Sequence, residues 1–421
     1  MKIDTKCVQA GYEPKNGEPR VVPIAQSTTF VYDSAETMGK LFDLEEEGFF
    51  YTRLGNPTLD AVEKKIAALE GGVGAMLTSA GQAASLISIT NIAKTGDHVI
   101  ASAAIYGGTF NLFNKTLRDL GIDFDFVDPD ITAEDLDQCF KPNTKAVFVE
   151  TVTNPSLDVI DLELFATVAH AHHVPLIVDN TFATPVNCRP FEWGADIVVH
   201  STSKYMDGHA VALGGCVVDS GNFDWTQGDY PMLTTPDETY HGIIYTKQFG
   251  KAAYIVKCRT HLMRDFGSQQ SPQNAFLLNL GLETLHLRMA RHCANAQAVA
   301  EFLESNENVE WVNYPGLPSN KYYEKAQKYM PNGTCGVISV GVKGGKEGAA
   351  RFMEALKLAK IVIHVADART CVLHPASTTH RQLSDQQLID AGIAPNMIRL
   401  SVGIEDPEDI IADLKQALEQ V

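Results

Sequence analysis

Strand-like and helix-like segments alternate from residue 57 to residue 200, and this rhythm restricts the fold more than any other feature of the chain. Apolar residues at helical spacing predict helices around and between a set of short apolar runs that predict strands. The alternation predicts an α/β fold, in which helices cover both faces of a mostly parallel sheet. The predicted strands are residues 75–78, 98–102, 124–127, 146–151, 176–180 and 197–200, and the predicted helices are residues 59–69, 82–95, 110–120, 133–140 and 162–172.

After about residue 250 the pattern changes, and helices and strands no longer alternate in the same way. This part of the chain predicts a smaller α+β domain. We expect one long or broken helix over residues 274–281 and 283–305, strands at 337–342 and 398–402, and helices at 349–358 and 407–418.

Residues 1–55 have many Gly and Pro residues and little periodicity, so we expect an irregular N-terminal arm. Such an arm is either disordered or wrapped over a partner. The 421 residues are enough for two or three domains. We therefore expect an arm at 1–55, a large domain at 56–285 and a small C-terminal domain at 286–421.

Charge and cysteine usage restrict the partners and the compartment. A net charge of −18 argues against a nucleic acid or an anionic membrane as partner, because a phosphate backbone requires a basic surface. No apolar run approaches the roughly 18 residues of a membrane helix, and the first residues lack the apolar core of a signal peptide. The 8 cysteines are scattered without a C-x-x-C pair, which is typical of free thiols. We expect a cytoplasmic protein.

Lys204 follows the predicted strand 197–200, between the hydroxyls of Ser201 and Ser203. Ligands of open parallel sheets bind at the carboxyl ends of the strands. There, an amine can form a Schiff base while hydroxyls bind a phosphate. Asp179 ends the preceding predicted strand and could pair with a pyridinium nitrogen. Lysine and acid together indicate pyridoxal phosphate (PLP), although a solvated Lys204 and an Asp179 that only caps a helix remain alternatives.

Three further positions suggest a ligand site. Gly81 and Gln82 join a predicted strand to a helix, so their N–H groups form either an anion site or a plain helix start. Tyr106 follows another strand and either stacks on a flat cofactor or packs locally. Arg399 lies in an apolar strand, where its guanidinium needs an anion: a ligand carboxylate or a structural acid.

A metal site is a weaker interpretation of the sequence. His170, His172 and His173 lie together, but at the end of a predicted helix their charge complements the helix dipole. They lack the spacing and the accompanying carboxylate of a ligand set. We expect no metal.

Several motifs, in order along nearly the whole chain, resemble the Cys/Met-metabolism family of PLP-dependent enzymes. The motifs are residues 26–30, the Tyr51-Thr52-Arg53 segment, the Ser201–Lys204 segment and residues 399–405. The resemblance implies fold type I, with an aspartate-aminotransferase-like PLP domain and a smaller C-terminal domain. It also implies an obligate homodimer, usually paired into a tetramer.

The resemblance assigns a role to each candidate residue. Lys204 carries PLP, Asp179 holds the ring nitrogen, and Tyr106 stacks on the ring. The phosphate ligands within the same chain are Gly81, Gln82, Ser201 and Ser203, and Tyr51 and Arg53 bind the phosphate of the neighbouring subunit. Arg399 clamps the substrate α-carboxylate, and Asn154 lies close to the ring and to that carboxylate.

Within the family, the chain is most similar to the O-acetylhomoserine sulfhydrylase branch. Residues 106–113, 214–225 and 224–250 carry this similarity, and Gly108 stands where methionine γ-lyases usually have Cys. The segment 363–370 departs from the family pattern. It places His364 where a small residue near the substrate carboxylate is expected. The sequence therefore specifies the reaction class more closely than it specifies the substrate.

The resemblance implies a transferase of methionine biosynthesis. Sulfide or a thiol would replace the acetate of O-acetyl-L-homoserine and give homocysteine or methionine, with Lys204 as the base and help from Tyr106 and Tyr51. Two other reactions remain open: γ-elimination, as in a methionine γ-lyase, and cystathionine γ-synthase activity. A non-enzymatic binding protein would lack PLP absorbance near ~420 nm.

Overall fold

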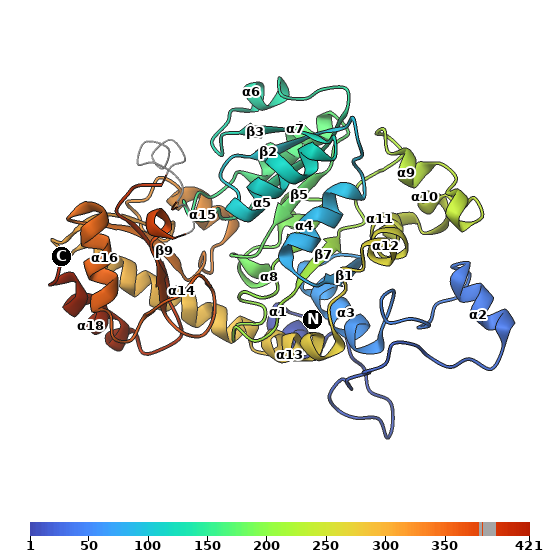
Figure 1. Ribbon diagram of the computed structural model, residues 1–421, viewed down its shortest axis with the longest axis horizontal. Helices are drawn as coiled ribbons and strands as arrows, with labels where there is room; N and C mark the ends of the chain where they lie inside the picture. Colours follow the sequence, from blue (N-terminus) through green and yellow to red (C-terminus); the bar gives the residue numbers. More distant parts are fainter. Residues whose placement is uncertain (379–380, 382–392) are drawn as a thin grey trace.

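The computed structural model describes residues 1–378, 381 and 393–421 and contains two β-sheets (Figure 1). The strands are Gly74–Thr78 (β1), His98–Ser102 (β2), Asp123–Val127 (β3), Thr144–Glu150 (β4), Leu176–Asp179 (β5), Ile197–His200 (β6), Gly215–Asp219 (β7), Val309–Asn313 (β8), Val337–Val342 (β9), Lys360–Ile361 (β10), Cys371–Leu373 (β11) and Met397–Ser401 (β12).

Helices make up most of the remaining regular structure. They are Ile3–Gln9 (α1), Ala35–Phe42 (α2), Pro57–Glu70 (α3), Gly81–Thr90 (α4), Gly107–Asn111 (α5), Ala133–Asp137 (α6), Leu162–Ala171 (α7), Thr184–Asn187 (α8), Pro231–Thr234 (α9), Tyr245–Gln248 (α10), Ala253–Lys257 (α11), Arg264–Phe266 (α12), Pro272–Glu283 (α13), Leu285–Glu304 (α14), Tyr323–Tyr329 (α15), Gly345–Ala355 (α16) and Pro407–Leu418 (α18).

The large sheet has seven strands in the order β1-β7-β6-β5-β4-β2-β3. The pairs from β6 to β3 are parallel, and both β1 and β6 run antiparallel to β7. β1 therefore points the same way as the other parallel strands, and only β7 is reversed. We did not expect a strand at β7. All the strands that precede predicted site residues of this sheet end at the same edge.

Both faces of this sheet are buried, as the α/β prediction requires. Val147 and Val149 of β4 belong to one hydrophobic cluster, whereas Ala146 and Phe148 of the same strand belong to another. Alternate side chains of a strand point to opposite faces, so helices cover the sheet on both sides. This arrangement confirms the predicted α/β fold class.

Helix α3 shows how local sequence sets an element. Asn56 accepts a hydrogen bond from Thr58 N at 3.0 Å, and Pro57 occupies the first turn. Gly71 ends the helix with φ +88°, a conformation that glycine adopts easily. The helix predicted from its apolar spacing is confirmed.

Other helices differ from the predictions. The helix predicted at 110–120 begins earlier, as α5, and continues as a π-helical turn over Leu112–Leu117. The predicted long helix after residue 274 is two helices, α13 and α14, which break at Thr284. Helix α4 ends at Thr90, five residues before the predicted end at 95, because the apolar pattern continues past the last helical turn.

The smaller sheet, of five strands in the order β10-β11-β12-β9-β8, packs against α14, α16 and α18 at one end of the molecule (Figure 1). β9 and β12 confirm two predicted strands. Strands β8, β10 and β11 were not predicted, since they are short or carry polar residues between the apolar ones.

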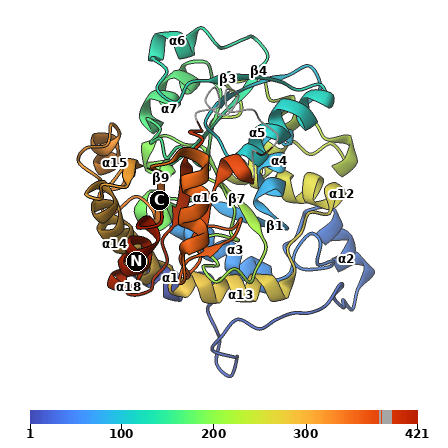
Figure 2. The same cartoon turned by 60° about the vertical axis from the view of Figure 1, so that its left-hand side comes forward.

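The N-terminal arm leaves the body of the molecule in a wide loop that carries α2 (Figures 1 and 2). Two parts of it are helical, so our expectation of an irregular segment was wrong there. Helix α1 packs on the body, where Cys7 is fully buried. The rest of the arm exposes apolar side chains, including Val31 at 98% and Phe42 at 56%. Such exposure is typical of a segment that contacts another chain.

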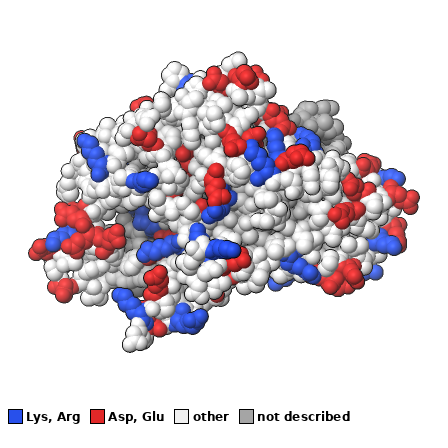
Figure 3. Space-filling view, turned by 180° about the vertical axis from the view of Figure 1, so that it is seen from behind, with Lys and Arg blue, Asp and Glu red and all other residues white. Residues whose placement is uncertain are grey.

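Among the described residues, no helix is both long enough and apolar enough to cross a membrane. The face in Figure 3 carries Lys and Arg side chains interspersed with Asp and Glu. Acidic and basic side chains are therefore mixed over this face, although the whole chain has a net charge of −18.

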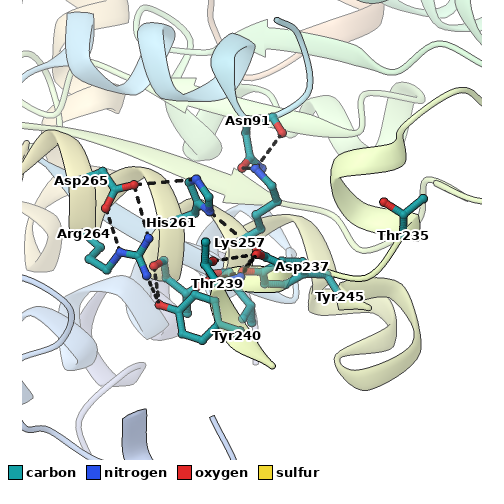
Figure 4. A network of polar contacts seen from close by, with 12 residues as sticks. Asn91, Thr235, Asp237, Thr239, Tyr240, Tyr245, Lys257, His261, Arg264 and Asp265 are labelled. Atoms are coloured by element: carbon teal, nitrogen blue, oxygen red, sulfur yellow. Dashed lines mark hydrogen bonds and ion pairs between the residues drawn. The ribbon is translucent and has the colours of Figure 1, made fainter. Parts of the chain in front are cut away.

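A polar network joins the segment 237–265 to the arm. Asp237 accepts a hydrogen bond from Tyr245 Oη at 3.2 Å, and Tyr240 Oη accepts one from Arg264 Nη1 at 3.0 Å. Figure 4 shows these side chains turned toward one another. The main-chain oxygen of Arg264 accepts a hydrogen bond from Arg53 Nη1. The network thus gives Arg53 of the arm a fixed partner.

Candidate active site

A cavity of about 600 Å³ lies at the edge where β1, β4, β5 and β6 end, and the small domain closes one side. Its volume falls within the roughly 300–1,000 Å³ of small-molecule sites. All predicted site residues except Tyr51 and Arg53 line it. The lining is Ala80, Gly81, Gln82, Ser85, Tyr106, Thr109, Glu150, Val152, Asn154, Asp179, Thr181, Phe182, Ser201, Ser203, Lys204, Ala210, Val211, Ala212, Leu213, Ile363, His364, Val365 and Arg399.

Lys204 extends into the cavity from the turn after β6. Its Nζ lies 3.2 Å from Nδ1 of His364 in the small domain. Burial and the positive charge of Arg399 lower the pKa of Lys204 to about 8, from an ordinary value of 10.5. About a tenth of this amine is therefore neutral at about pH 7, and a neutral amine is a nucleophile.

Asp179 ends β5 and is fixed by the next residues. Its Oδ1 accepts hydrogen bonds from Thr181 N at 2.9 Å and from Thr181 Oγ1 at 2.5 Å. The Thr181 oxygen in turn accepts a bond from Ser201 N at 2.8 Å. Burial raises the pKa of Asp179, against the hydrogen bonds from Thr181 and the positive field of His200. A cation beside Asp179 would favour its charged form.

Glu150 is a site residue that our sequence reasoning missed. It ends β4 beside Asp179, and its Oε1 accepts a hydrogen bond from Tyr106 N at 2.7 Å. Burial and the nearby Asp179 raise the pKa of Glu150 well above its ordinary value. The signal was present, since Glu150 is an acid at the end of a predicted strand, as Asp179 is.

The turn after β1 forms an anion cradle. Gly81 opens helix α4, where main-chain N–H groups and the helix dipole favour an anion. A Cβ on Gly81 would lie 2.7 Å from Cβ of Ser201, so only glycine lets the two segments approach this closely. The Ser203 hydroxyl, in contrast, bonds both ways with the main chain of Gly214, at 2.9 and 3.1 Å. This bonding makes Ser203 a support of the turn as well as part of the lining.

Arg399 reaches the cavity from β12 and is 7% exposed. Its Nη1 donates to Asn154 Oδ1 at 3.2 Å, and its Nη2 donates to Ile363 O at 3.0 Å. Burial lowers the pKa of Arg399 to about 10. Within the described part of the chain Arg399 forms no ion pair. The alternative interpretation, in which a structural acid neutralises Arg399, therefore has no supporting carboxylate there. The guanidinium remains available to an anion in the cavity.

Tyr106 follows β2 and is 48% exposed at the cavity wall. Gln82 lies beside it and accepts a hydrogen bond from Thr109 Oγ1 at 3.2 Å. A Cβ on Gly108 would meet Gln82 Nε2 at 2.5 Å and the Tyr106 ring at 2.6 Å. Gly108 thus leaves room for both side chains.

Tyr51 and Arg53 lie on the arm, outside the cavity of their own chain. Tyr51 is 43% exposed, and the Arg53 guanidinium lies 5.2 Å from the centre of its ring. No residue of the cavity lining contacts them through a recorded hydrogen bond in the described ranges. Their predicted role in a neighbouring subunit is not tested within one chain.

The histidines at the end of α7 do not converge on one point. His170 Nε2 lies 2.8 Å from Asp196 Oδ2, whereas His172 Nε2 lies 2.7 Å from Asp137 Oδ1. His170 and His172 therefore each have a carboxylate partner of their own. The hydrogen bond that the His170 ring donates to the Asp196 carboxylate raises the pKa of His170.

Comparison with known proteins identifies the family of this chain. The sequence model of the Cys/Met metabolism PLP-dependent enzyme family matches residues 4–419. The chain belongs to this family. Homocysteine synthase of Schizosaccharomyces pombe is 46% identical over 99% of the chain and 98% of its own length. O-acetyl-L-homoserine sulfhydrylase 1 of Thermus thermophilus is 44% identical over 99% of the chain and all of its own length.

A solved family member has the same fold. The O-acetylhomoserine (thiol)-lyase of Campylobacter jejuni superposes with a TM-score of 0.96 at 37% identity, and each chain is covered completely. Its crystal structure contains a pyridoxyl-lysine phosphate. The chain described here is thus a PLP-dependent enzyme of the α/β, fold type I class.

The residues of the cavity fit PLP. The Gly81–Ser201 cradle suits an anion such as a phosphate, and Asp179 needs a cation such as a protonated ring nitrogen. Lys204 supplies an amine of lowered pKa in the same cavity. These features match the lysine and acid that PLP requires from a protein.

Proposed function

We propose that the enzyme replaces the acetate of O-acetyl-L-homoserine with sulfide or a thiol and releases homocysteine or methionine. The observation that carries this proposal is the full-length identity of 44–46% to relatives named for this chemistry. The cavity is consistent with it, because it contains a nucleophilic lysine and a buried arginine that forms no ion pair among the described residues. Gly108 also agrees with the sulfhydrylase branch.

Substrate orientation is the task of Arg399 and Asn154. The amide oxygen of Asn154 holds Nη1 of the guanidinium in place at 3.2 Å. The forked guanidinium can then bind the substrate α-carboxylate with two hydrogen bonds. This clamp directs the amino group and the Cα–H bond toward Lys204.

Proton transfer is the task of Lys204. PLP, when bound, would supply an electron sink for the bonds around the substrate Cα. The freed Lys204 Nζ, neutral in part because its pKa is about 8, would take the Cα proton, release it within the site and then take one from Cβ. It would return protons to these carbons after the sulfur nucleophile has added. Loss of the Cβ proton allows acetate to leave from Cγ, where the sulfur nucleophile adds. We assign assistance in proton transfer to Tyr106 and Tyr51.

The remaining site residues hold the cofactor. We assign the ring nitrogen to Asp179 and the ring face to Tyr106. The assigned phosphate ligands are Gly81, Gln82, Ser201 and Ser203 of one chain, together with Tyr51 and Arg53 of the neighbouring chain. Glu150 positions Tyr106 through the main-chain N–H of that residue.

We further propose that the protein is a homodimer, paired into a tetramer, with the N-terminal arm 1–55 laid against the neighbouring subunit. The large domain is 56–285 and the small domain is 286–421. The exposed apolar residues of the arm support this arrangement. A cytoplasmic location agrees with 8 cysteines that are all unpaired thiols.

Product analysis tests the reaction. The purified enzyme is incubated with O-acetyl-L-homoserine and sulfide, and in parallel with methionine alone. We expect homocysteine and acetate in the first reaction and little 2-oxobutanoate in the second. Formation of 2-oxobutanoate and methanethiol from methionine, with no replacement product from the ester, would instead identify a γ-lyase.

A further inference from the structure

His364 is the one cavity residue that contacts the Lys204 amine through a recorded hydrogen bond in the described part of the chain. Its Nδ1 lies 3.2 Å from Lys204 Nζ, although 160 positions separate the two residues. The contact joins the two domains across the cavity. It occurs on the segment 363–370, where the sequence departs from the family pattern.

The main chain on which His364 sits is fixed by neighbouring strands. Cys371 Sγ of β11 donates to His364 O at 3.3 Å. Arg399 Nη2 of β12 donates to the oxygen of Ile363 at 3.0 Å. The main chain next to His364 is therefore held by the same arginine that we assign to the substrate carboxylate.

Charged groups on every side of His364 influence its protonation. Burial and the positive charges of Lys204 and Arg399 lower the pKa of His364, and the acids Asp367 and Asp207 only partly oppose them. A neutral imidazole has one donor and one acceptor nitrogen. A neutral imidazole facing the N–H groups of Lys204 presents Nδ1 as the acceptor, a tautomer that we assign from this contact. Its Nε2 is buried and has no partner among the described residues.

We propose that His364 is a positioning residue that holds the free amine of Lys204 for proton transfer. The inference rests on the proposed reaction, since that reaction frees Lys204 from the cofactor and uses it as a base. A lysine side chain has four flexible carbons and can adopt many rotamers. One N–H bond to Nδ1 restricts this freedom and leaves the lone pair available to the substrate.

Three variants separate this role from packing. His364→Ser removes the acceptor, and His364→Asn places an amide oxygen close to the position of Nδ1. Val362→Ser is a matched control at an exposed residue two positions before His364. We expect His364→Ser to lower kcat by roughly ten- to a hundredfold, with KM changed by less than about threefold. His364→Asn should recover part of the loss, and Val362→Ser should resemble wild type.

Substrate deuterated at Cα provides the first decisive measurement. A poorly held base slows proton abstraction, so the isotope effect on kcat should be larger in His364→Ser than in wild type. The effect should return toward the wild-type value in His364→Asn. A lower kcat with an unchanged isotope effect in both variants would overturn the proposal.

Cofactor uptake provides a second measurement that does not depend on turnover. PLP is added to cofactor-free protein, and absorbance near ~420 nm is followed with time. His364→Ser should take up PLP more slowly but reach the same final absorbance. Equal uptake rates in His364→Ser and wild type would overturn the role of His364. A wild-type enzyme that forms no homocysteine would contradict the proposed function, and the uptake measurement does not depend on that result.

Discussion

Lys204 and Arg399 are two basic groups that line the same cavity, and neither forms an ion pair with an acid in the described ranges. Each positive charge makes the other less favourable, because burial limits screening by water. The arrangement is stable only if an anion arrives or the lysine gives up its proton. An amino-acid substrate and a neutral Lys204 meet both conditions.

The pH dependence of cofactor uptake should report the state of Lys204. Its lowered pKa, about 8, means that the amine is protonated below this pH and neutral above it. We expect the rate of PLP uptake by cofactor-free enzyme to rise through about pH 8 and then level off. Absorbance near ~420 nm, followed between about pH 6 and 11, measures this rate. A midpoint near the ordinary lysine value would contradict the assignment, and Lys204→Ala is the control that forms no such band.

Arg399→Lys should impair substrate binding more than cofactor binding. A lysine is a point charge and loses the two-pronged fit to a carboxylate. We expect the KM for amino-acid substrates to rise roughly a hundredfold, which corresponds to about 2–3 kcal/mol. Steady-state kinetics and PLP titration measure the two effects, with Arg369→Lys as a control at a side chain that is 73% exposed. An unchanged KM would mean that another residue holds the carboxylate.

At the scale of elements, the strand order brings the site together. β1 and β6 are separated by more than a hundred positions in sequence, but both pair with β7. The turns that follow them are therefore neighbours, and Gly81 lies against Ser201. Helix α4 starts at this contact, so the position of its first turn depends on the absence of a side chain at Gly81.

Gly81→Ala should weaken PLP binding. The added Cβ would lie 2.7 Å from Cβ and 2.9 Å from Cα of Ser201, so the start of α4 must move away. Overpacking of this kind costs about 1–3 kcal/mol, and we expect the Kd for PLP to rise by about tenfold or more. Gly39→Ala, in α2 where nothing lies within 4 Å of the new Cβ, is the matched control. Equal Kd values for the two variants would show that the cradle tolerates the side chain.

At the scale of the whole molecule, the N-terminal arm has surface that one chain does not cover. Val31 and Tyr51 are exposed, and Arg53 contacts the main chain of Arg264 instead of the cavity. An arm of this kind is consistent with a site completed by two chains. The proposed dimer follows from the apolar exposure and from the family pattern of Tyr51 and Arg53.

Mixed dimers test the origin of Arg53. Arg53→Ala alone should weaken PLP binding, and Lys204→Ala alone should abolish turnover. Hybrids of the two variants should recover activity, because one of their sites contains Arg53 of one chain and Lys204 of the other. The hybrid dimers are separated by means of a charged tag, and their activity is then measured. This activity shows which chain supplies Arg53 to each site. Hybrids as inactive as both parents would place Arg53 in the site of its own chain.

Much of the fold could be predicted from the sequence, because strand and helix periodicity is a local property. The alternation of elements, the capped helix α3 and the strand-end positions of Asp179 and Lys204 all follow from short stretches of residues. The family motifs extended this to the cofactor and reaction class, which the comparisons support over residues 4–419. The element type was therefore more predictable than its ends, as Thr90 and Thr284 show.

Only the tertiary structure decided which distant residues meet. The reversal of β7, the place of Glu150 beside Asp179 and the 3.2 Å contact between Lys204 and His364 depend on segments far apart in sequence. The lowered pKa of Lys204 has the same origin, since burial and the charge of Arg399 exist only in the folded chain. Sequence determines local conformation and the chemical groups available, whereas distance, burial and mutual charge arise from packing.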